Sequence, residues 1–339
     1  MSRVVTAPGT DLDVTPAGLS TDRYEPSPTR VLPLHSRVVD LNNLTAAVTR
    51  RELYAAGYTS NDLQRAERAD VIVRLAPGIF APPAICSEPA DVRHRERAIA
   101  TARDRDGALS HVSAATVHGL PIWGHRLDQV HLTRKPTLFG SSSSGQVTVH
   151  CDRREPAVME IDGTAVVPVA RTVVDLAKSA RRVPAIATGD AALHFGLCTT
   201  GELADELQQI AGFPGYHAAR RAVAEMTALS ESVLESRSRM AFIDSPDIPD
   251  PALQLNVYSD DGTFLGRGDF GWEDERVIGE CDGAMKYVRA AREVLVREKE
   301  RTDRLHEAGW RVVRWGWHDL DQRNLVVDRV LRMLRGRAT

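Results

Sequence analysis

The chain has 339 residues, a formal net charge of −3 at pH 7 and an ordinary apolar fraction of 42%. Its length suffices for two or three domains with separate cores. Because its net charge is slightly negative, the chain as a whole does not attract nucleic acid electrostatically, and DNA binding requires local basic patches. The four cysteines are widely spaced, which argues against structural zinc and against a disulfide framework. Since no apolar run could span a membrane and no secretory signal is visible, we expect a cytoplasmic protein without membrane contact.

Residues 1–38 are rich in Pro, Thr, Ser and Asp and have neither helical nor strand periodicity. Such a composition buries too little apolar surface to offset the entropy of ordering a chain. We therefore expect a disordered or loosely docked arm.

The segment 39–85 is predicted to form a small winged helix-turn-helix. Two short helical patterns, LNNLTAAVTR and RELYAAG, precede a third, TSNDLQRAERAD, which Thr59 or Ser60 would cap. VIVRLAPGIFAPP then gives two short strands around a turn at Pro77 and Gly78. The run from AAGYTSNDLQR to VRLAPGIFAP resembles the N-terminal DNA-binding domain of antitoxins from type IV abortive-infection systems.

That resemblance implies that the third helix enters the major groove and that the wing touches phosphate. The residues given these DNA-binding roles are Asn61, Gln64, Arg65 and Arg68 on the helix and Arg74 on the wing. Because acidic residues dilute this basic face, a module used only for packing or dimerisation is the alternative.

Residues 86–228 are predicted to form an α/β middle domain that begins with a charged helix. SHVSAATVHGLP and VARTVVDLA resemble the middle region of the same antitoxin-type proteins. Ser110 is expected to cap a helix beside His111 rather than act as a nucleophile, because no matched acid or nucleophile elbow accompanies it. Arg171 and Asp175 are spaced for an ion pair on one helix. We assign no chemistry to this domain.

Residues 229–339 are predicted to form helix, three strands, helix, strand and helix, in that order. In the hairpin around FLGRGDFGWEDERVIGECDG, a tight turn centred between Asp274 and Glu275 sets Asp269 directly opposite Glu280. Asp282 shares the strand face of Glu280. Three carboxylates on one face repel one another unless a cation lies among them, and oxygen ligands favour Mg²⁺ or Mn²⁺.

This last segment resembles the PD-(D/E)XK nuclease superfamily, nearest the branch related to very short patch repair endonucleases. The resemblance rests on the Glu of SVLESRSR, the Gln of PALQLNV, the Asp of GRGDF, the acids of GECDG and the run EKERTDRLHEAGWRVVRW. It implies a restriction-endonuclease-like α/β/α fold. It also implies that Glu235, Asp269 and Glu280 hold the metal and that Gln254 supports them.

The chain departs from the superfamily at one catalytic position. Asp282 stands where the usual Lys polarises the attacking water. Either Lys286 reaches in from four residues later, or Asp282 is a further metal ligand and the metal alone activates water. The basic residues of the following helix, which include Arg301, form either a solvated face or a set of phosphate contacts.

The leading interpretation is a metal-dependent DNA endonuclease, acting in repair or defence and targeted by the winged helix. The alternative is a DNA-binding, antitoxin-like transcriptional regulator whose nuclease fold no longer cuts. A third hypothesis is that the chain is an interaction module that binds a protein partner such as a toxin.

Overall fold

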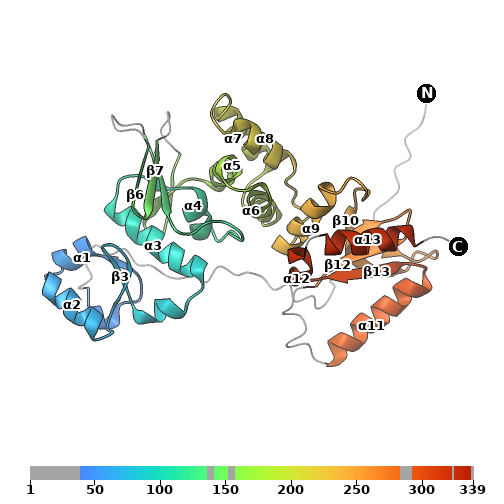
Figure 1. The fold of residues 1–339 in the computed structure, drawn as a ribbon, viewed down its shortest axis with the longest axis horizontal. Helices are drawn as coiled ribbons and strands as arrows, with labels where there is room; N and C mark the ends of the chain where they lie inside the picture. The colour runs from blue at the N-terminus through green and yellow to red at the C-terminus, as the bar shows by residue number, and fades with distance from the viewer. Residues whose placement is uncertain (1–38, 136–140, 152–156, 283–291, 323, 337–339) are drawn as a thin grey trace, which may run out of the picture.

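The structure is a computed structural model that describes residues 39–135, 141–151, 157–282, 292–322 and 324–336. Within these ranges the chain is a mixed α/β protein with three sheets, one in each of three successive parts (Figure 1). The predicted α/β class is thereby confirmed at this coarse level. The arm predicted for residues 1–38 and the position of Lys286 lie outside the described residues.

The N-terminal part packs two helices against a three-stranded antiparallel sheet with the order β1-β3-β2. Its elements are η1 (Leu41–Asn43), β1 (Val48–Thr49), α1 (Arg50–Ala55), α2 (Ser60–Arg68), β2 (Val73–Ala76), β3 (Ile79–Ala81) and η2 (Pro83–Ser87). Thr59 caps α2 through a reciprocal pair of bonds with Asp62, as the sequence predicts. Gly78 makes the predicted wing turn with a positive φ of 79°, a conformation that glycine adopts without strain.

One element of this part differs from the prediction. LNNLTAAVTR is not one continuous helix: it contains the three-residue 3-10 helix η1, the short strand β1 and, at Arg50, the first residue of α1. Val48 and Thr49 are β-branched and pair with Phe80 and Ile79 of β3. The Thr49 hydroxyl also accepts the N–H of Glu52, so that α1 begins directly after the strand.

The middle part combines a six-stranded sheet, in the order β6-β7-β5-β4-β9-β8, with a group of helices. Its first elements are α3 (Ala90–Asp104), β4 (Ala108–Leu109), α4 (His111–Val117), β5 (Val130–Arg134), β6 (Ser142–Ser144), β7 (Val147–Cys151), β8 (Met159–Ile161) and β9 (Thr164–Val166). The remaining elements are α5 (Val169–Ser179), α6 (Arg182–His194), α7 (Thr200–Gln209) and α8 (Tyr216–Ala224).

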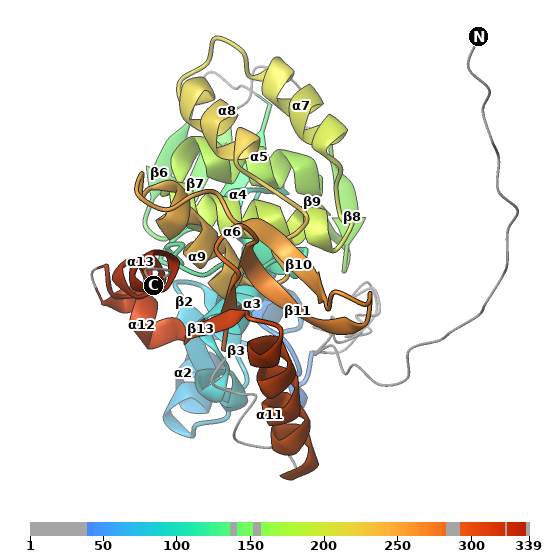
Figure 2. The same ribbon diagram turned by 90° about the vertical axis from the view of Figure 1, so that its right-hand side faces the viewer.

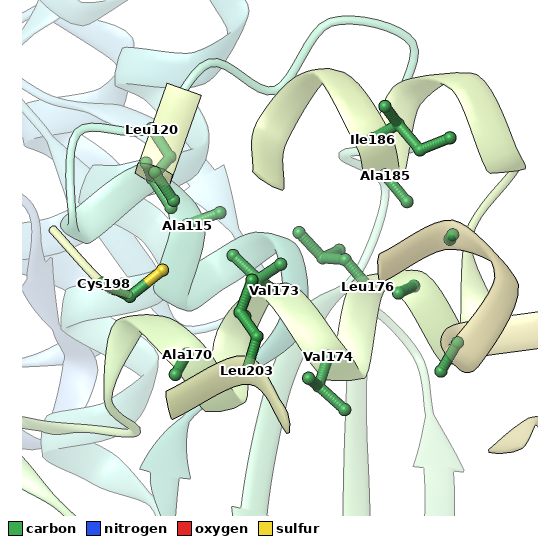
Figure 3. Packing of buried hydrophobic residues seen from close by; sticks show 14 of the residues in the cluster. Ala115, Leu120, Ala170, Val173, Val174, Leu176, Ala185, Ile186, Cys198 and Leu203 are labelled. Carbon is green, nitrogen blue, oxygen red and sulfur yellow. The ribbon is translucent and has the colours of Figure 1, made fainter. Parts of the chain in front are cut away.

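Helix α5 is the centre of the helical group. Its apolar residues Val173, Val174 and Leu176 are buried against side chains such as Leu203 and Ala185 from the surrounding helices (Figure 3). The Arg171–Asp175 pair of the same helix forms as predicted, with Nε 3.0 Å from Oδ2. Both residues are buried, so this ion pair belongs to the interior of the middle part and not to a helix surface.

The C-terminal part has the element order that the sequence predicts. Its elements are α9 (Val233–Ile243), β10 (Ala252–Tyr258), β11 (Phe264–Trp272), β12 (Val277–Cys281), α11 (Arg292–Glu307), β13 (Arg311–Trp315), α12 (Trp317–Asp321) and α13 (Leu325–Arg335). In place of the single closing helix that the sequence predicts, the structure has the two helices α12 and α13. Strand β13 lies parallel to β12, and the other pairs of the sheet β10-β11-β12-β13 are antiparallel.

The C-terminal sheet is covered by helices on both faces. Phe270 and Trp315 pack with Phe242 of α9 and Val330 of α13 on one face, while Ile278 packs with residues of α11 on the other. Figure 2 shows α11 and α13 on opposite sides of β13. Among the described residues, no helix has the length and apolarity needed to cross a membrane.

Candidate functional site

The hairpin of β11 and β12 has the register that the sequence predicts. Phe270 pairs with Gly279, and continuing the ladder by one residue sets Asp269 against Glu280. At this point the Asp269 carboxylate accepts the backbone N–H of Cys281 at 2.6 Å. Cys281 itself is buried, as expected for a small core residue between two polar positions.

Gln254 extends this polar row onto β10. Leu253 pairs with Phe270 and Leu255 with Gly268, so Gln254 falls opposite Asp269. Its φ of +53° is unusual for a residue other than glycine and re-aims the side chain relative to the strand. The Gln254 amide donates to Glu235 Oε2 at 2.7 Å. Three adjacent strands therefore carry Gln254, Asp269 and Glu280 at neighbouring positions.

Glu235 joins this row from the first turn of α9. Its carboxylate accepts the Ser232 hydroxyl at 2.7 Å and the Glu231 N–H at 2.9 Å, in addition to the Gln254 amide. Burial, followed by the nearby charge of Asp269, raises the pKa of Glu235 to about 7. The Glu235 carboxyl group thus holds a proton more tightly than an exposed carboxyl group does. A bound cation would relieve the charge repulsion between Glu235 and Asp269 that contributes to the raised pKa.

Glu280 has different neighbours. It is buried, its Oε1 pairs with Arg301 of α11, and its Oε2 lies 2.7 Å from Nε of Arg314 on β13. Both guanidinium groups also contact Glu298. The carboxylate of Glu280 is consequently neutralised by two arginines, and its contacts differ from those of Glu235.

Asp282 follows β12, where its backbone N–H donates to the Trp315 carbonyl at 2.8 Å and its side chain is half-buried. Lys286, the other residue considered at this position, lies outside the described residues. The choice between Asp282 and Lys286 as the group that replaces the usual Lys therefore stays a prediction.

The predicted metal ligands do not form a tight group. Across the described parts of the chain, three ligand atoms of His, Cys, Asp or Glu lie within 4.8 Å of one another at a single place, which is made of His111, His131 and His150. Gln254 nevertheless offers a feature suited to a hard cation. Its Oε1 is buried and has no hydrogen-bond partner among the described residues, and this oxygen belongs to a side chain that contacts Glu235.

The residues predicted to contact DNA share one exposed face of α2. Asn61, Gln64, Arg65 and Arg68 are all exposed and follow helical spacing, while Leu63 is buried on the opposite side. Arg65 pairs with Asp62 at the end of this face.

The wing residue Arg74 is also exposed, and its guanidinium is held by Glu67 at 2.9 Å and lies over the Phe80 ring. The acidic residues noted in the sequence therefore neutralise part of the basic face.

No sequence motif indicated a functional role for the three histidines His111, His131 and His150. His131 and His150 belong to strands that are neighbours only because β5 and β7 pair in parallel, and His111 begins α4. The sequence of each strand shows which side chains alternate between its two faces, but it does not show which distant strands pair. A signal was present in QVHLT and QVTVHCD, where each histidine lies between two apolar residues and therefore points to the face of its strand opposite to theirs.

Comparisons with known proteins find two similar proteins, both from Mycobacterium tuberculosis. No protein-family model matches it. The chain is 31% identical over 192 residues to Uncharacterized protein Rv2248 of Mycobacterium tuberculosis (strain ATCC 25618 / H37Rv), and equally so to Uncharacterized protein MT2308 of strain CDC 1551 / Oshkosh. Each alignment covers 52% of this chain and 69% of the relative. The chain belongs, as a distant member, to the family that includes these two mycobacterial proteins.

Proposed function

We propose that the chain is a metal-dependent DNA endonuclease whose C-terminal part has the PD-(D/E)XK architecture. One observation carries the proposal: Gln254, Asp269 and Glu280 occupy neighbouring positions on three adjacent strands, beside Glu235 at the start of α9. The order of helices and strands around this row is the one that the resemblance to the superfamily implies.

The residues present fit an oxygen-preferring cation. Glu235, Asp269 and Glu280, with Asp282 as a further candidate, would hold Mg²⁺ or Mn²⁺, and the buried Oε1 of Gln254 offers one more oxygen. The bound ion would lower the pKa of water and neutralise charge on the phosphate. The Cys281 N–H donates to Asp269 Oδ2 at 2.6 Å and so fixes the position of this carboxylate.

We infer that Arg301 and Arg314 bind the phosphate of the DNA substrate. Guanidinium groups bind phosphate through paired hydrogen bonds, and these two lie directly at Glu280. When a phosphodiester approaches, we expect them to divide their contacts between its oxygens and Glu280. That exchange would free Glu280 for the cation.

The exposed face of α2 would bring this centre to DNA. Arg65 and Arg68 supply phosphate or base contacts, and Asn61 and Gln64 supply amide groups of the kind that read adenine in the major groove. A DNA repair or defence role agrees with this combination of a DNA-binding part and a cleaving part.

A second candidate function is a DNA-binding, antitoxin-like regulator with an inactive nuclease fold. Two specific features favour it: Asp282 occupies the usual Lys position, and two arginines neutralise Glu280. A regulator of this kind would act with a protein partner such as a toxin and would bind duplex DNA without cutting it.

Cleavage of a panel of labelled DNAs separates the two functions. Plain duplex, mismatched, branched and single-stranded DNA are incubated with Mg²⁺ or Mn²⁺, with a chelator in parallel. The endonuclease proposal requires a metal-dependent product from at least one DNA, and requires its loss in Asp269→Asn. Tight duplex binding without any product across the panel supports the regulator instead.

A further inference from the structure

We propose that His111, His131 and His150 form a transition-metal site in the middle part, separate from the carboxylate row and suited to Zn²⁺. The three imidazoles come from α4, β5 and β7, and one ring nitrogen from each lies within 4.8 Å of the other two. Imidazole nitrogen is a preferred ligand of Zn²⁺, Cu²⁺ and Ni²⁺, whereas Mg²⁺ prefers oxygen. The ligand type therefore distinguishes this site from the one proposed above.

Two of the three nitrogens are about as close together as two ligands of one metal ion. Nδ1 of His131 lies 2.9 Å from Nε2 of His150, and two ligands of a tetrahedral zinc are about 3.3 Å apart when each Zn–N bond is about 2.0–2.1 Å. Without an ion, these two nitrogens can share only one proton. A metal ion would serve both of them with a small outward movement of the rings.

The backbone presents the three side chains to one place. His131 pairs with Thr148, and His150 pairs with Thr133 two residues along, so both histidines are on the same face of β5 and β7. The ring of His111 stacks on that of His150 with centroids 4.0 Å apart. His111 is buried and has a φ of +51°, a conformation that is uncommon for residues other than glycine and is often found at functional sites.

The buried carboxylate of Asp175 lies next to His111 of the cluster. Asp175 Oδ2 lies 4.0 Å from Nδ1 of His111, and its Oδ1 has no hydrogen-bond partner among the described residues, although Lys178 lies 3.6 Å away. At 4.0 Å Asp175 acts on His111 through its charge, and the hydrogen-bond partner of His111 Nδ1 is the Ser110 hydroxyl at 3.0 Å. Asp175 also offsets the positive charge that Arg171 and Lys178 bring near the cluster.

The cluster is reachable from a cavity. A cavity of about 400 Å³ is lined by His111 and His131 together with polar residues that include Gln129 and Ser179. Three protein ligands with an opening on the remaining side are typical of zinc sites that keep one position for water or a substrate. The proposed site is therefore open to exchangeable ligands.

Cobalt titration tests the site directly. The titration uses the untagged chain with Asp269→Asn and Glu280→Gln, because these substitutions remove two carboxylates of the other proposed metal site. The protein is stripped of metal with a chelator and then titrated with Co²⁺. We expect one equivalent to bind with visible d–d absorption, and Zn²⁺ to displace it. In the same background, His131→Ala and His150→Ala should each weaken binding at least tenfold, and His217→Ala and His306→Ala, at exposed histidines, should leave it unchanged.

X-ray absorption of the Zn²⁺-loaded chain needs no histidine variant and covers the case in which a substitution unfolds the protein. We expect a first shell of nitrogen with imidazole scattering. Absence of stoichiometric binding, equal binding by His131→Ala, or a first shell made only of oxygen would each overturn the proposal. None of these results bears on cleavage by the carboxylate row, so the two proposals can fail independently.

Discussion

Arg239 of α9 and Asp190 of α6 form a buried ion pair between the C-terminal and middle parts, with Nη2 2.9 Å from Oδ2. The same carboxylate accepts the Ser236 hydroxyl at 2.7 Å and the Thr227 N–H at 2.8 Å. Burial raises the pKa of Asp190, and Arg239 opposes that effect. The helix that carries Glu235 is thereby fixed to the middle part by charge as well as by packing (Figure 1).

Removing Arg239 should destabilise the chain strongly, because Asp190 would be left buried without its partner. For Arg239→Met we expect the free energy of unfolding in urea to fall by about 3–5 kcal/mol. Arg126→Met, in a pair that is exposed to solvent, should change it by less than about 1 kcal/mol. Adding Asp190→Asn to Arg239→Met should restore part of the loss, and a double variant less stable than the single one would contradict this reading.

Acidification should destabilise the folded chain through His94. Burial lowers the pKa of His94 from 6.5 to about 4, and its ring bonds the Ser113 hydroxyl and the Leu127 carbonyl. Between these pH values the unfolded chain binds more protons than the folded chain, so stability is lost as pH falls. The contribution is about 2 kcal/mol between pH 7 and pH 5. Urea unfolding at both pH values should show a smaller drop for His94→Gln than for the native chain, and an equal drop would refute the assignment.

Arg237 should help to hold α12 and the middle part together. Its guanidinium carbon lies 4.4 Å from the ring centre of Trp123 and 4.8 Å from that of Trp317, and it pairs with Asp321 at 2.7 Å. We expect Arg237→Met to lower the free energy of unfolding by about 1–2 kcal/mol and to alter tryptophan fluorescence. Arg220→Met, at an exposed position on α8, is the matched control and should change neither.

Salt dependence should reveal whether α2 contacts DNA. Arg68→Ala is expected to weaken duplex binding and to reduce the slope of log affinity against log salt concentration by about 0.9, the value for one phosphate contact. Arg221→Ala, an exposed residue on α8, should leave the slope unchanged. Fluorescence anisotropy with a labelled duplex measures both, and identical slopes for the two variants would place the DNA elsewhere.

Local patterns predicted the parts of the fold that depend on neighbours in sequence. The Thr59 cap, the Gly78 turn and the register of Asp269 against Glu280 all follow from short segments. The predicted helix at LNNLTAAVTR failed because pairing of Val48 and Thr49 with β3 outweighed helical propensity.

The parts that depend on distant segments were not predictable in the same way. The contacts of Glu280 with Arg301 and Arg314 join positions 21 and 34 residues away. The histidine cluster depends on the parallel pairing of β5 with β7. No local periodicity contains such information, since it arises from how packed elements meet.

The proposed endonuclease activity is measured as the rate at which Mg²⁺-dependent cleavage converts supercoiled plasmid to nicked or linear DNA. The native chain is compared with Glu280→Gln, which removes one charge from the row, and with Glu273→Gln, which makes the same change at an exposed position in the β11–β12 turn. We expect cleavage by the native chain and by Glu273→Gln, and a rate at least about 100-fold lower for Glu280→Gln. Equal cleavage by all three proteins, or none by the native chain, would contradict the proposal.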